Sequence, residues 1–390
     1  MAGEWRNSTW GDEISLEYGK ALRGYSDVSG KYRVFGSNGP IGWTSNSLAD
    51  GPAVILGRKG AYRGVEFSRE PFWVIDTAYY VVPKTEMDSR WLYYAIKHHK
   101  LGEIDDGSPI PSTTRAAVYV RDVEIPPLEE QRAIARILGA LDDKIELNRR
   151  TNETLEAIAA ALFKSWFVDF DGIPAEDMQE SELGLIPKGW RVMAFGDIAQ
   201  QGKGTVNPGA SPEAMFTHYS LPAFDAAQLP VVEYGEAIRS NKTPVPNSSV
   251  LISKLNPHIP RIWPIGNAGE HAVCSTEFIV WTPRTPANTA FLYCLASSPE
   301  FNAAMCQLVT GTSNSHQRVK PEQLANLRTF AADEESIVKF GGAAEPLMRE
   351  VLRNRAESGT LAALRDELLP RLFSGRLQMK NIETIIGAAT

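Results

Sequence analysis

The sequence predicts an α/β fold in which two mixed α/β lobes are separated by two long helices that pair antiparallel. Three observations support this fold class. A heptad pattern occupies residues 126–172, a second one occupies residues 331–375, and the regions before the two patterns share short apolar runs in the same order. The chain is therefore expected to be an internal repeat, with the order lobe, helix, lobe, helix.

Length and composition are those of a globular chain with more than one domain. The 390 residues are 43% hydrophobic and 22% charged. Three cysteines (Cys274, Cys294 and Cys306) are too few and odd in number for a disulfide framework, which suits a reducing cytosol. No stretch resembles a signal peptide or an apolar span of ~20 residues, so we expect a cytoplasmic protein without membrane contact.

The net charge of −7 is unevenly distributed along the chain. Residues 126–186 carry 6 basic and 13 acidic side chains, which accounts for the whole net charge. An acidic balance ordinarily disfavours nucleic-acid binding, because phosphate neutralisation requires lysine and arginine. Both flanking lobes are close to neutral, however, and leave room for a local basic face on each.

The first lobe is expected at residues 1–125, and the second, with its linker, at 173–330. In both, β-branched and aromatic runs alternate with turns and with helical stretches such as 89–99 and 289–297. The two copies align at an offset that rises from 185 to 206, as loop insertions would produce. Representative matches are Trp5 with Trp190, Val54 with Val250, Thr77 with Thr276, Leu92 with Leu292, and Gly107-Ser108 with Gly311-Thr312.

The first long helix is expected at 126–172, after two prolines and before the sequence DFDGIP. About 40 residues would form a rod of ~60 Å. Its predicted pairing residues are Leu141, Ile145, Asn148, Asn152, Leu155, Leu162 and Trp166. The acidic residues of this helix are expected on an outer face that either repels DNA or is simply solvated; they are Asp142, Asp143, Glu146, Glu153 and Glu156.

The second long helix is expected at 331–375, followed by a tail at 376–390. Its predicted pairing residues are Leu347, Val351, Asn354, Leu361, Leu368 and Leu372. Each lies 206 positions after its counterpart in the first helix, and Asn354 repeats Asn148. The second pattern begins with AADEES and lacks the prolines that precede the first.

Polar and basic residues recur after equivalent apolar strands and in a second loop of each lobe. Arginine can pair with guanine, and asparagine or glutamine with adenine, in the major groove of DNA. In the first lobe the predicted DNA-binding residues are Arg58, Lys59, Gly60, Arg63, Ser108, Thr113, Thr114 and Arg115. In the second they are Lys254, Asn256, His258, Arg261, Thr312, Ser313, Asn314, His316, Gln317 and Arg318. The alternative is that both sets are ordinary solvated loops.

The chain lacks the motifs of the enzymes that modify or translocate DNA. There is no glycine-rich loop for a methyl donor and no GxxxxGK[ST] loop, and Asn256-Pro257-His258-Ile259 only imitates the motif that holds a flipped base. His98-His99 and the pair His271 and Cys274 are isolated, so no metal site is expected. We therefore expect no catalytic residue and no cofactor.

Three passages resemble the specificity subunits of type I restriction-modification systems: IPPLEEQRAIARILGALDDKIELNRRTNETLEAIAAALFKSWFVDFDG, LGLIPKGWRVMAFGDIA and LRDELLPRLFSGRL. The resemblance implies two target recognition domains, each reading one half of a bipartite site in double-stranded DNA. It also implies helices that set the gap and dock methyltransferase subunits, two of them, together with restriction (helicase-nuclease) subunits. The alternative is a duplicated interaction scaffold without DNA specificity.

Overall fold

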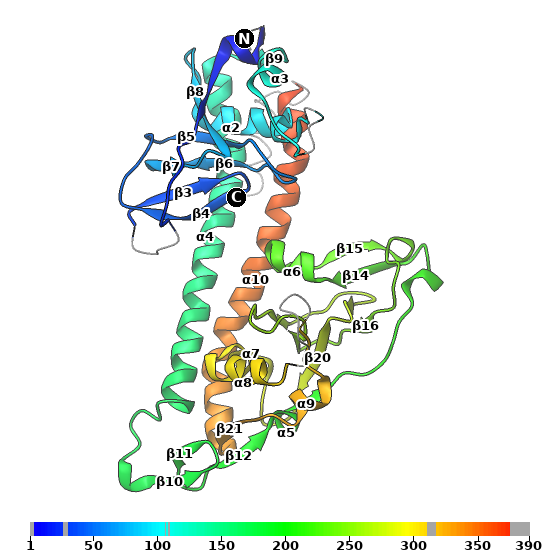
Figure 1. The fold of residues 1–390 in the computed structure, drawn as a ribbon. Coiled ribbons are helices and arrows are strands. Elements are labelled where there is room, and N and C mark those ends of the chain that lie inside the picture. The colour runs from blue at the N-terminus through cyan, green and yellow to red at the C-terminus, as the bar shows by residue number, and fades with distance from the viewer. Residues whose placement is uncertain (1–3, 26–29, 106, 108–109, 310–316, 375–390) are drawn as a thin grey trace. The chain divides into compact units, whose positions relative to one another are not determined.

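A computed structural model describes residues 4–25, 30–105, 107, 110–309 and 317–374 (Figure 1). The chain divides into two compact units. The first consists of Met1–Lys144 with Leu361–Thr390, and the second of Ile145–Thr360. Each unit contains one lobe and one portion of both long helices, α4 (Leu128–Phe167) and α10 (Glu334–Phe373).

The first unit contains a two-stranded sheet, β1-β9, a four-stranded sheet, β2-β8-β5-β6, and a three-stranded sheet, β4-β3-β7 (Figure 1). Its strands are β1 (Arg6–Thr9), β2 (Ile14–Tyr18), β3 (Tyr32–Gly36), β4 (Gly39–Thr44), β5 (Ala53–Gly57), β6 (Val65–Ser68), β7 (Phe72–Val74), β8 (Ala78–Pro83) and β9 (Asp122–Ile125). Its short helices are α1 (Trp10–Glu13), α2 (Ser89–His98), η1 (Leu101–Glu103) and α3 (Arg115–Tyr119).

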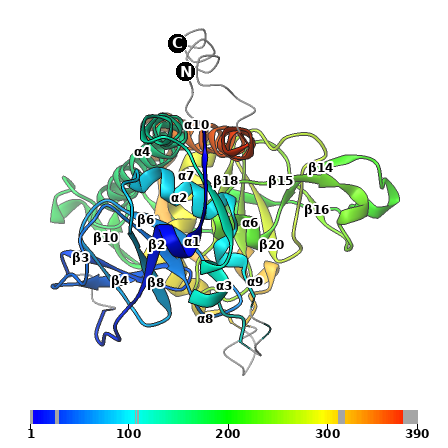
Figure 2. The ribbon, with the colours of Figure 1, turned by 90° about the horizontal axis from the view of Figure 1, so that it is seen from above.

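Helix α2 joins the four-stranded sheet of the first unit to α4 (Figure 2). The Asp88 carboxylate begins α2 by accepting the backbone N–H of Trp91 at 2.8 Å. Beyond this cap, Trp91 and Leu92 are buried in one apolar cluster with Leu56 of β5 and Leu138 of α4. The apolar side chains of α2 therefore pack against both the four-stranded sheet and α4.

The second unit contains two-stranded sheets β10-β11 and β12-β21, and four-stranded sheets β13-β20-β17-β18 and β15-β14-β19-β16. Its strands are β10 (Met178–Ser181), β11 (Gly184–Pro187), β12 (Arg191–Ala194), β13 (Ala199–Gln201), β14 (Met215–Tyr219), β15 (Val231–Tyr234), β16 (Thr243–Pro244), β17 (Ser249–Ser253), β18 (Ile262–Ile265), β19 (Val273–Cys274), β20 (Phe278–Pro283) and β21 (Arg328–Ala332). Its short helices are η2 (Ala175–Asp177), α5 (Phe195–Ile198), η3 (Pro208–Ala210), α6 (Leu221–Ala227), η4 (Gly235–Ala237), α7 (Thr289–Ser297), α8 (Pro299–Gln307) and α9 (Pro321–Ala325).

The predicted internal repeat is present in the strand topology. Sheet β2-β8-β5-β6 corresponds to β13-β20-β17-β18, and β3 pairs antiparallel with β4 and parallel with β7, just as β14 pairs with β15 and β19. One match made from the sequence is wrong. Val54 lies opposite Val81 and Val250 lies opposite Trp281, so the offset here is 200 and Thr77 corresponds to Glu277, not to Thr276. The strand ladder fixes this register, whereas the shared threonine is coincidental.

The two long helices begin in different ways. At the start of α4 the Pro127 carbonyl accepts the backbone N–H of Gln131 at 3.0 Å. The start of α10 has no proline; instead the Asp333 carboxylate accepts the backbone N–H of Ser336 at 2.8 Å and its hydroxyl at 2.9 Å. A carboxylate cap thus replaces the prolines that the second copy lacks. None of the described helices combines the length and the apolar composition needed to cross a lipid bilayer.

The helices pair antiparallel, as predicted. Within the second unit, Asn148 Nδ2 donates to Ser358 Oγ at 3.3 Å, and Asn354 Nδ2 donates to Asn152 Oδ1 at 2.9 Å. Asn148 and Asn354 are repeat equivalents, as are Asn152 and Ser358. The two hydrogen bonds are therefore repeat equivalents of each other, related by a local two-fold axis. This layer of polar residues fixes the register in which α4 and α10 pair.

The predicted pairing residues are buried or half-buried, but they do not define the whole apolar face of the helices. Asn148, Asn152, Val351, Asn354 and Leu372 are buried, and Leu141, Ile145, Leu155, Leu162, Trp166, Leu347, Leu361 and Leu368 are half-buried. Phe163 and Phe167 are more deeply buried than the seam positions beside them. Both contact Phe291 of α7 and Phe340 of α10, because α4 packs here against a lobe helix as well as against its partner. The buried apolar stripe on α4 is therefore wider than a heptad seam.

The expectation of an acidic outer face is wrong for two of its residues. Asp142 accepts the Tyr94 hydroxyl at 2.5 Å and the Arg365 guanidinium at 2.7 Å. Glu156 accepts Arg355 at 2.6 Å. These carboxylates flank the seam, where arginines of α10 reach across to them, so they help pair the helices.

A buried carboxylate lies at the base of the first lobe. Glu13 ends α1, and its side chain is 1% exposed. Arg6 donates to it at 2.5 and 3.0 Å, Ser8 at 2.5 Å and Thr85 at 2.6 Å. The hydrogen-bonded Arg6 guanidinium, helped by the two hydroxyls, holds the pKa of Glu13 at about 2.

This network predicts a stability change in acid. Because the folded pKa of Glu13 lies below its unfolded value, its contribution is present above about pH 4.5 and is lost as pH falls toward 2. Up to about 3 kcal/mol of unfolding free energy is involved. Denaturant titrations should show a stability gap between the wild type and Glu13→Gln that narrows from pH 6 to pH 3. A gap independent of pH would contradict an ionised Glu13.

Candidate nucleic-acid interface

In the first lobe two of the predicted loops lie side by side. The chain after β5 runs next to the segment that precedes α3. Gly60 N–H donates to the Pro111 carbonyl at 3.0 Å, and Thr113 N–H donates to the Arg58 carbonyl at 2.8 Å, with a bridge between Lys59 and Ser112. These loops, residues 58–63 and 110–115, form what we call the first loop pair.

The second lobe forms the same arrangement from equivalent residues. Asn256 N–H donates to the Gln317 carbonyl at 2.8 Å, and Val319 N–H donates to the Lys254 carbonyl at 3.0 Å, with a bridge between Leu255 and Arg318. Residues 254–261 and 317–320 form the second loop pair. Gly60 and Asn256 hold the same place, and both have positive φ, at 111° and 51°. Asparagine tolerates positive φ better than most residues, so the second lobe can form the same turn without a glycine.

An aromatic ring organises two arginines of the first loop pair. The guanidinium carbons of Arg58 and Arg115 lie 4.9 and 4.2 Å from the centre of the Tyr18 ring. Arg58 also donates to the Asp76 carbonyl. Arg115 donates to the Leu16 carbonyl and forms an ion pair with Glu17 at 3.7 Å, so both guanidinium groups keep further N–H groups for a ligand. Cation–aromatic stacking holds both charges at the surface in fixed orientations.

Two exposed side chains complete this surface. Lys59 is exposed, and Tyr62 is 78% exposed at the tip of the same loop. An exposed aromatic ring in the same loop pair as three cationic side chains suits a nucleic acid, which offers phosphates and flat bases. Sequence reasoning missed Tyr18 and Tyr62, although Tyr62 stands within the run of basic residues from 58 to 63.

Other predicted residues of the first lobe have internal partners. Arg63 donates to the carbonyls of Gly60, Gly102 and Ile104 at 2.6 to 3.0 Å and to the Thr113 hydroxyl at 3.2 Å. Thr113 is fully buried. Thr114 begins α3 by accepting the backbone N–H of Ala117, and Ser108 lies outside the described residues. Arg63 thus ties the two loops of the pair together.

The second loop pair presents a different set of side chains. His258 is exposed and Lys254 is half-buried, and neither contacts a carboxylate of the described chain. Arg261 donates through Nε and Nη2 to the Asp225 carboxylate, at 2.6 and 2.9 Å. The strand pairing aligns Arg261 with Gly64 of the first lobe and not with Arg63. Arg318 is bound likewise by Glu277, at 3.1 Å to each oxygen. Thr312, Ser313, Asn314 and His316 lie outside the described residues.

The buried thiols are unsuited to nucleophilic chemistry. Burial raises the pKa of Cys274 and of Cys294 to about 12, so both stay protonated. Among the described residues, no group of three or more His, Cys, Asp or Glu side chains is placed to hold a metal ion. What the described loop pairs offer is cationic and aromatic surface.

Comparisons with known proteins agree with this geometry. A sequence profile described as "Type I restriction modification DNA specificity domain" matches residues 5–157. The type I restriction enzyme MjaIX specificity subunit of Methanocaldococcus jannaschii is 26% identical over 317 residues, covering 77% of this chain and 72% of the relative. The HindI specificity subunit of Haemophilus influenzae is 22% identical over 347 residues, covering 68% and 71%.

A solved structure shares the fold over nearly the whole chain. The crystal structure of the type I restriction-modification system S subunit from M. genitalium superposes with a TM-score of 0.55 and 16% identity, covering 95% of this chain and 96% of that one. The two lobes and both long helices are therefore features of a fold already seen in a solved protein.

Proposed function

This chain belongs to the specificity subunits of type I restriction-modification systems, and from that premise we propose that each lobe reads one half of a bipartite DNA site. One observation carries the proposal. The two lobes build equivalent loop pairs on equivalent strands, yet display different side chains there. Equivalent scaffolds with different surface residues suit two half-sites of different sequence.

We assign the surface side chains to DNA and the internal ones to loop placement. In the first lobe the DNA contacts are Arg58, Lys59, Tyr62 and Arg115, and in the second they are Lys254 and His258. Asn256, whose Oδ1 is buried, is assigned to the shape of its turn. Arg63, Thr113, Arg261 and Arg318 position the loops through their internal bonds. This division explains why two such different sets of basic residues follow equivalent strands.

The long helices are proposed to set the gap between half-sites and to dock two methyltransferase subunits, one for each copy of the repeat. Restriction subunits would join this complex, and we place it in the cytoplasm with the DNA. Methyl transfer and cleavage belong to these partners, because the sequence contains no methyl-donor loop and no nucleotide-binding loop. An interaction scaffold without DNA specificity is unsupported, since the matching profile describes a DNA specificity domain.

Salt dependence tests this function. With about four neutralised phosphates, affinity of the assembled complex for its target duplex should fall ~100-fold between 50 and 200 mM salt. The chain alone, with its net charge of −7, should bind more weakly than the complex. Fluorescence anisotropy with target and scrambled duplexes measures both. Equal affinity for the two duplexes, or for complex and isolated chain, would contradict the proposal.

A further inference from the structure

Two tyrosine rings of the first lobe hold the guanidinium groups of Arg58 and Arg115. The ring centres of Tyr18 and Tyr79 lie 5.1 Å apart. The Arg58 guanidinium carbon lies 4.9 Å from the first centre and 5.8 Å from the second, and that of Arg115 lies 4.2 Å from the first. Burial raises the pKa of Tyr79 to about 12, so its hydroxyl stays protonated and does not neutralise Arg58. Contact with the rings restricts the orientation of both guanidinium planes.

Each guanidinium group keeps one edge that carries two nitrogen donors. A guanidinium has five N–H groups in a planar fork. Arg58 donates through Nη1 to the Asp76 carbonyl at 2.9 Å, which leaves the edge formed by Nε and Nη2. Arg115 donates through Nε to the Leu16 carbonyl at 2.7 Å, which leaves the edge formed by Nη1 and Nη2. A two-donor edge of fixed orientation matches the paired acceptors O6 and N7 of guanine in the major groove.

The carboxylate of Glu17 favours a base over a phosphate at this place. It lies 3.7 Å from Arg115 Nη2, and 41% of its side chain is exposed. A phosphate would be repelled by this negative charge. In a G·C pair, by contrast, the N4 amino group of cytosine lies beside guanine O6 and can donate to a carboxylate. An arginine next to a carboxylate therefore suits a G·C base pair better than the DNA backbone.

The second lobe does not repeat this arrangement, although it repeats the strands and the loop pair. None of the four equivalent residues is a tyrosine or an arginine. The registers of strands and loops place Ile279 at the position of Tyr79, Lys203 at that of Tyr18, Lys254 at that of Arg58 and Pro321 at that of Arg115. Side chains that differ between two copies of one scaffold can give each half-site its own sequence.

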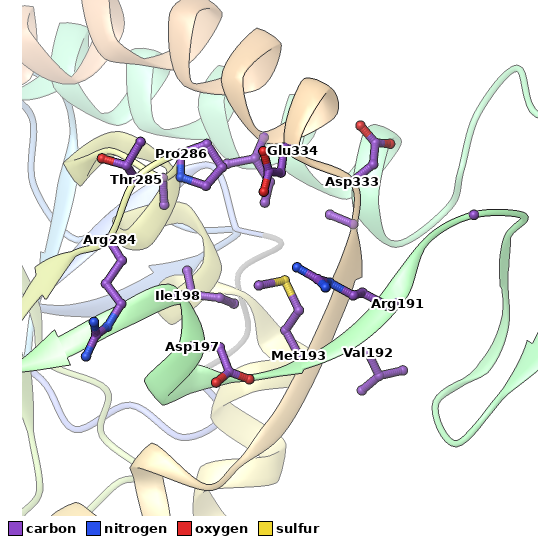
Figure 3. A pocket seen from close by; sticks show the side chains of 14 residues that line it. Arg191, Val192, Met193, Asp197, Ile198, Arg284, Thr285, Pro286, Asp333 and Glu334 are labelled. Atoms are coloured by element: carbon purple, nitrogen blue, oxygen red, sulfur yellow. The ribbon is translucent and has the colours of Figure 1, made fainter.

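Several arginines of the second lobe are instead accompanied by carboxylates. In the second loop pair, Asp225 binds Arg261 and Glu277 binds Arg318. Figure 3 shows a cavity of about 720 Å³ in the second unit whose lining includes two arginines and three carboxylates, namely Arg191, Arg284, Asp197, Asp333 and Glu334. Arg58, in contrast, forms no ion pair within the described part of the chain, so its charge stays available to a ligand.

We propose that Arg58 and Arg115 read guanine in the half-site of the first lobe. This inference rests on the proposed function, in which each lobe reads one half of the site. Tyr18 and Tyr79 are positioning residues, because they hold the two-donor edges without contacting the base through hydrogen bonds. The loop pair thus supplies a base-specific contact and not charge alone.

Replacing each arginine by lysine tests the assignment, because lysine keeps the charge but loses the planar two-donor edge. Arg58→Lys and Arg115→Lys are assembled with their partner subunits, and methylation is measured on libraries randomised in one half-site. Each variant should lower the preference for guanine about tenfold at one position of one half-site. Arg121→Lys changes an exposed arginine outside the loop pair and is the matched control; it should leave the preference unchanged.

A change in the DNA gives a measurement that does not depend on the folding of a variant. 7-Deazaguanine lacks the N7 acceptor but still pairs with cytosine. At the position identified by the lysine variants it should weaken binding of the wild-type complex about tenfold, measured by fluorescence anisotropy. It should not weaken binding of the double variant Arg58→Ala with Arg115→Ala any further, because the contact is already lost.

The outcomes separate this inference from the proposed function. If the wild-type complex shows no sequence preference in either half-site, both fall. If it reads two half-sites but the lysine variants change no guanine preference, or if 7-deazaguanine binds as well as guanine, the guanine assignment alone falls. Equal weakening on all sequences would assign both arginines to phosphates and would also overturn it.

Discussion

A chain with one extra heptad in each long helix should prefer DNA sites whose two halves lie about 3 base pairs farther apart. Second copies of Asn148–Thr154 and of Leu352–Ser358 add facing segments to α4 and α10, since these stretches contain the paired polar layer. Seven residues add ~10.5 Å to each helix while the seam stays in phase. At 3.4 Å per base pair the gap lengthens accordingly, and each half-sequence should stay unchanged because no lobe residue is altered.

Methylation of duplexes that differ only in gap length measures this effect. Peak activity should be lower than in the wild type, because 3 base pairs rotate one half-site by roughly 100° around the helix. Insertion into α4 alone is the control; it should break the seam register and destabilise the chain. An unchanged gap preference in a folded double-insertion variant would leave the helices as a docking surface only.

The long helices and the repeat could be predicted from the sequence because heptad periodicity and duplicated apolar runs are local signals. Helices α4 and α10 span Leu128–Phe167 and Glu334–Phe373. The extent of their apolar faces could not be predicted. Phe163 and Phe167 are buried by Phe291 of α7, a tertiary contact that seam spacing does not encode.

The loops that form the candidate site were predictable, but the role of each side chain was not. Arg58 and Arg63 look equivalent in sequence, yet one stacks on Tyr18 at the surface and the other binds three carbonyls inside. Burial and hydrogen-bond partners decide this, and both come from residues distant in the chain.

The largest effects on recognition are expected from the loop-pair side chains that are assigned to DNA. Lys59→Ala with Tyr62→Ala should alter recognition of one half-site only, and Lys254→Ala with His258→Ala should alter the other. Removing a base contact should cost ~1 to 3 kcal/mol at its position, whereas removing a phosphate contact weakens binding to all sequences alike. Lys339→Ala, an exposed change on α10, is the control and should alter neither.

Methylation by the assembled complex on two libraries, each randomised in one half-site, tests most directly whether each lobe reads one half. Sequencing the methylated fraction gives a preference profile for each half-site. We predict that the first double variant changes one profile, the second changes the other, and neither changes both. If both variants alter the same half-site, or if both profiles stay at wild type in folded variants, the assignment of one half-site to each loop pair is wrong.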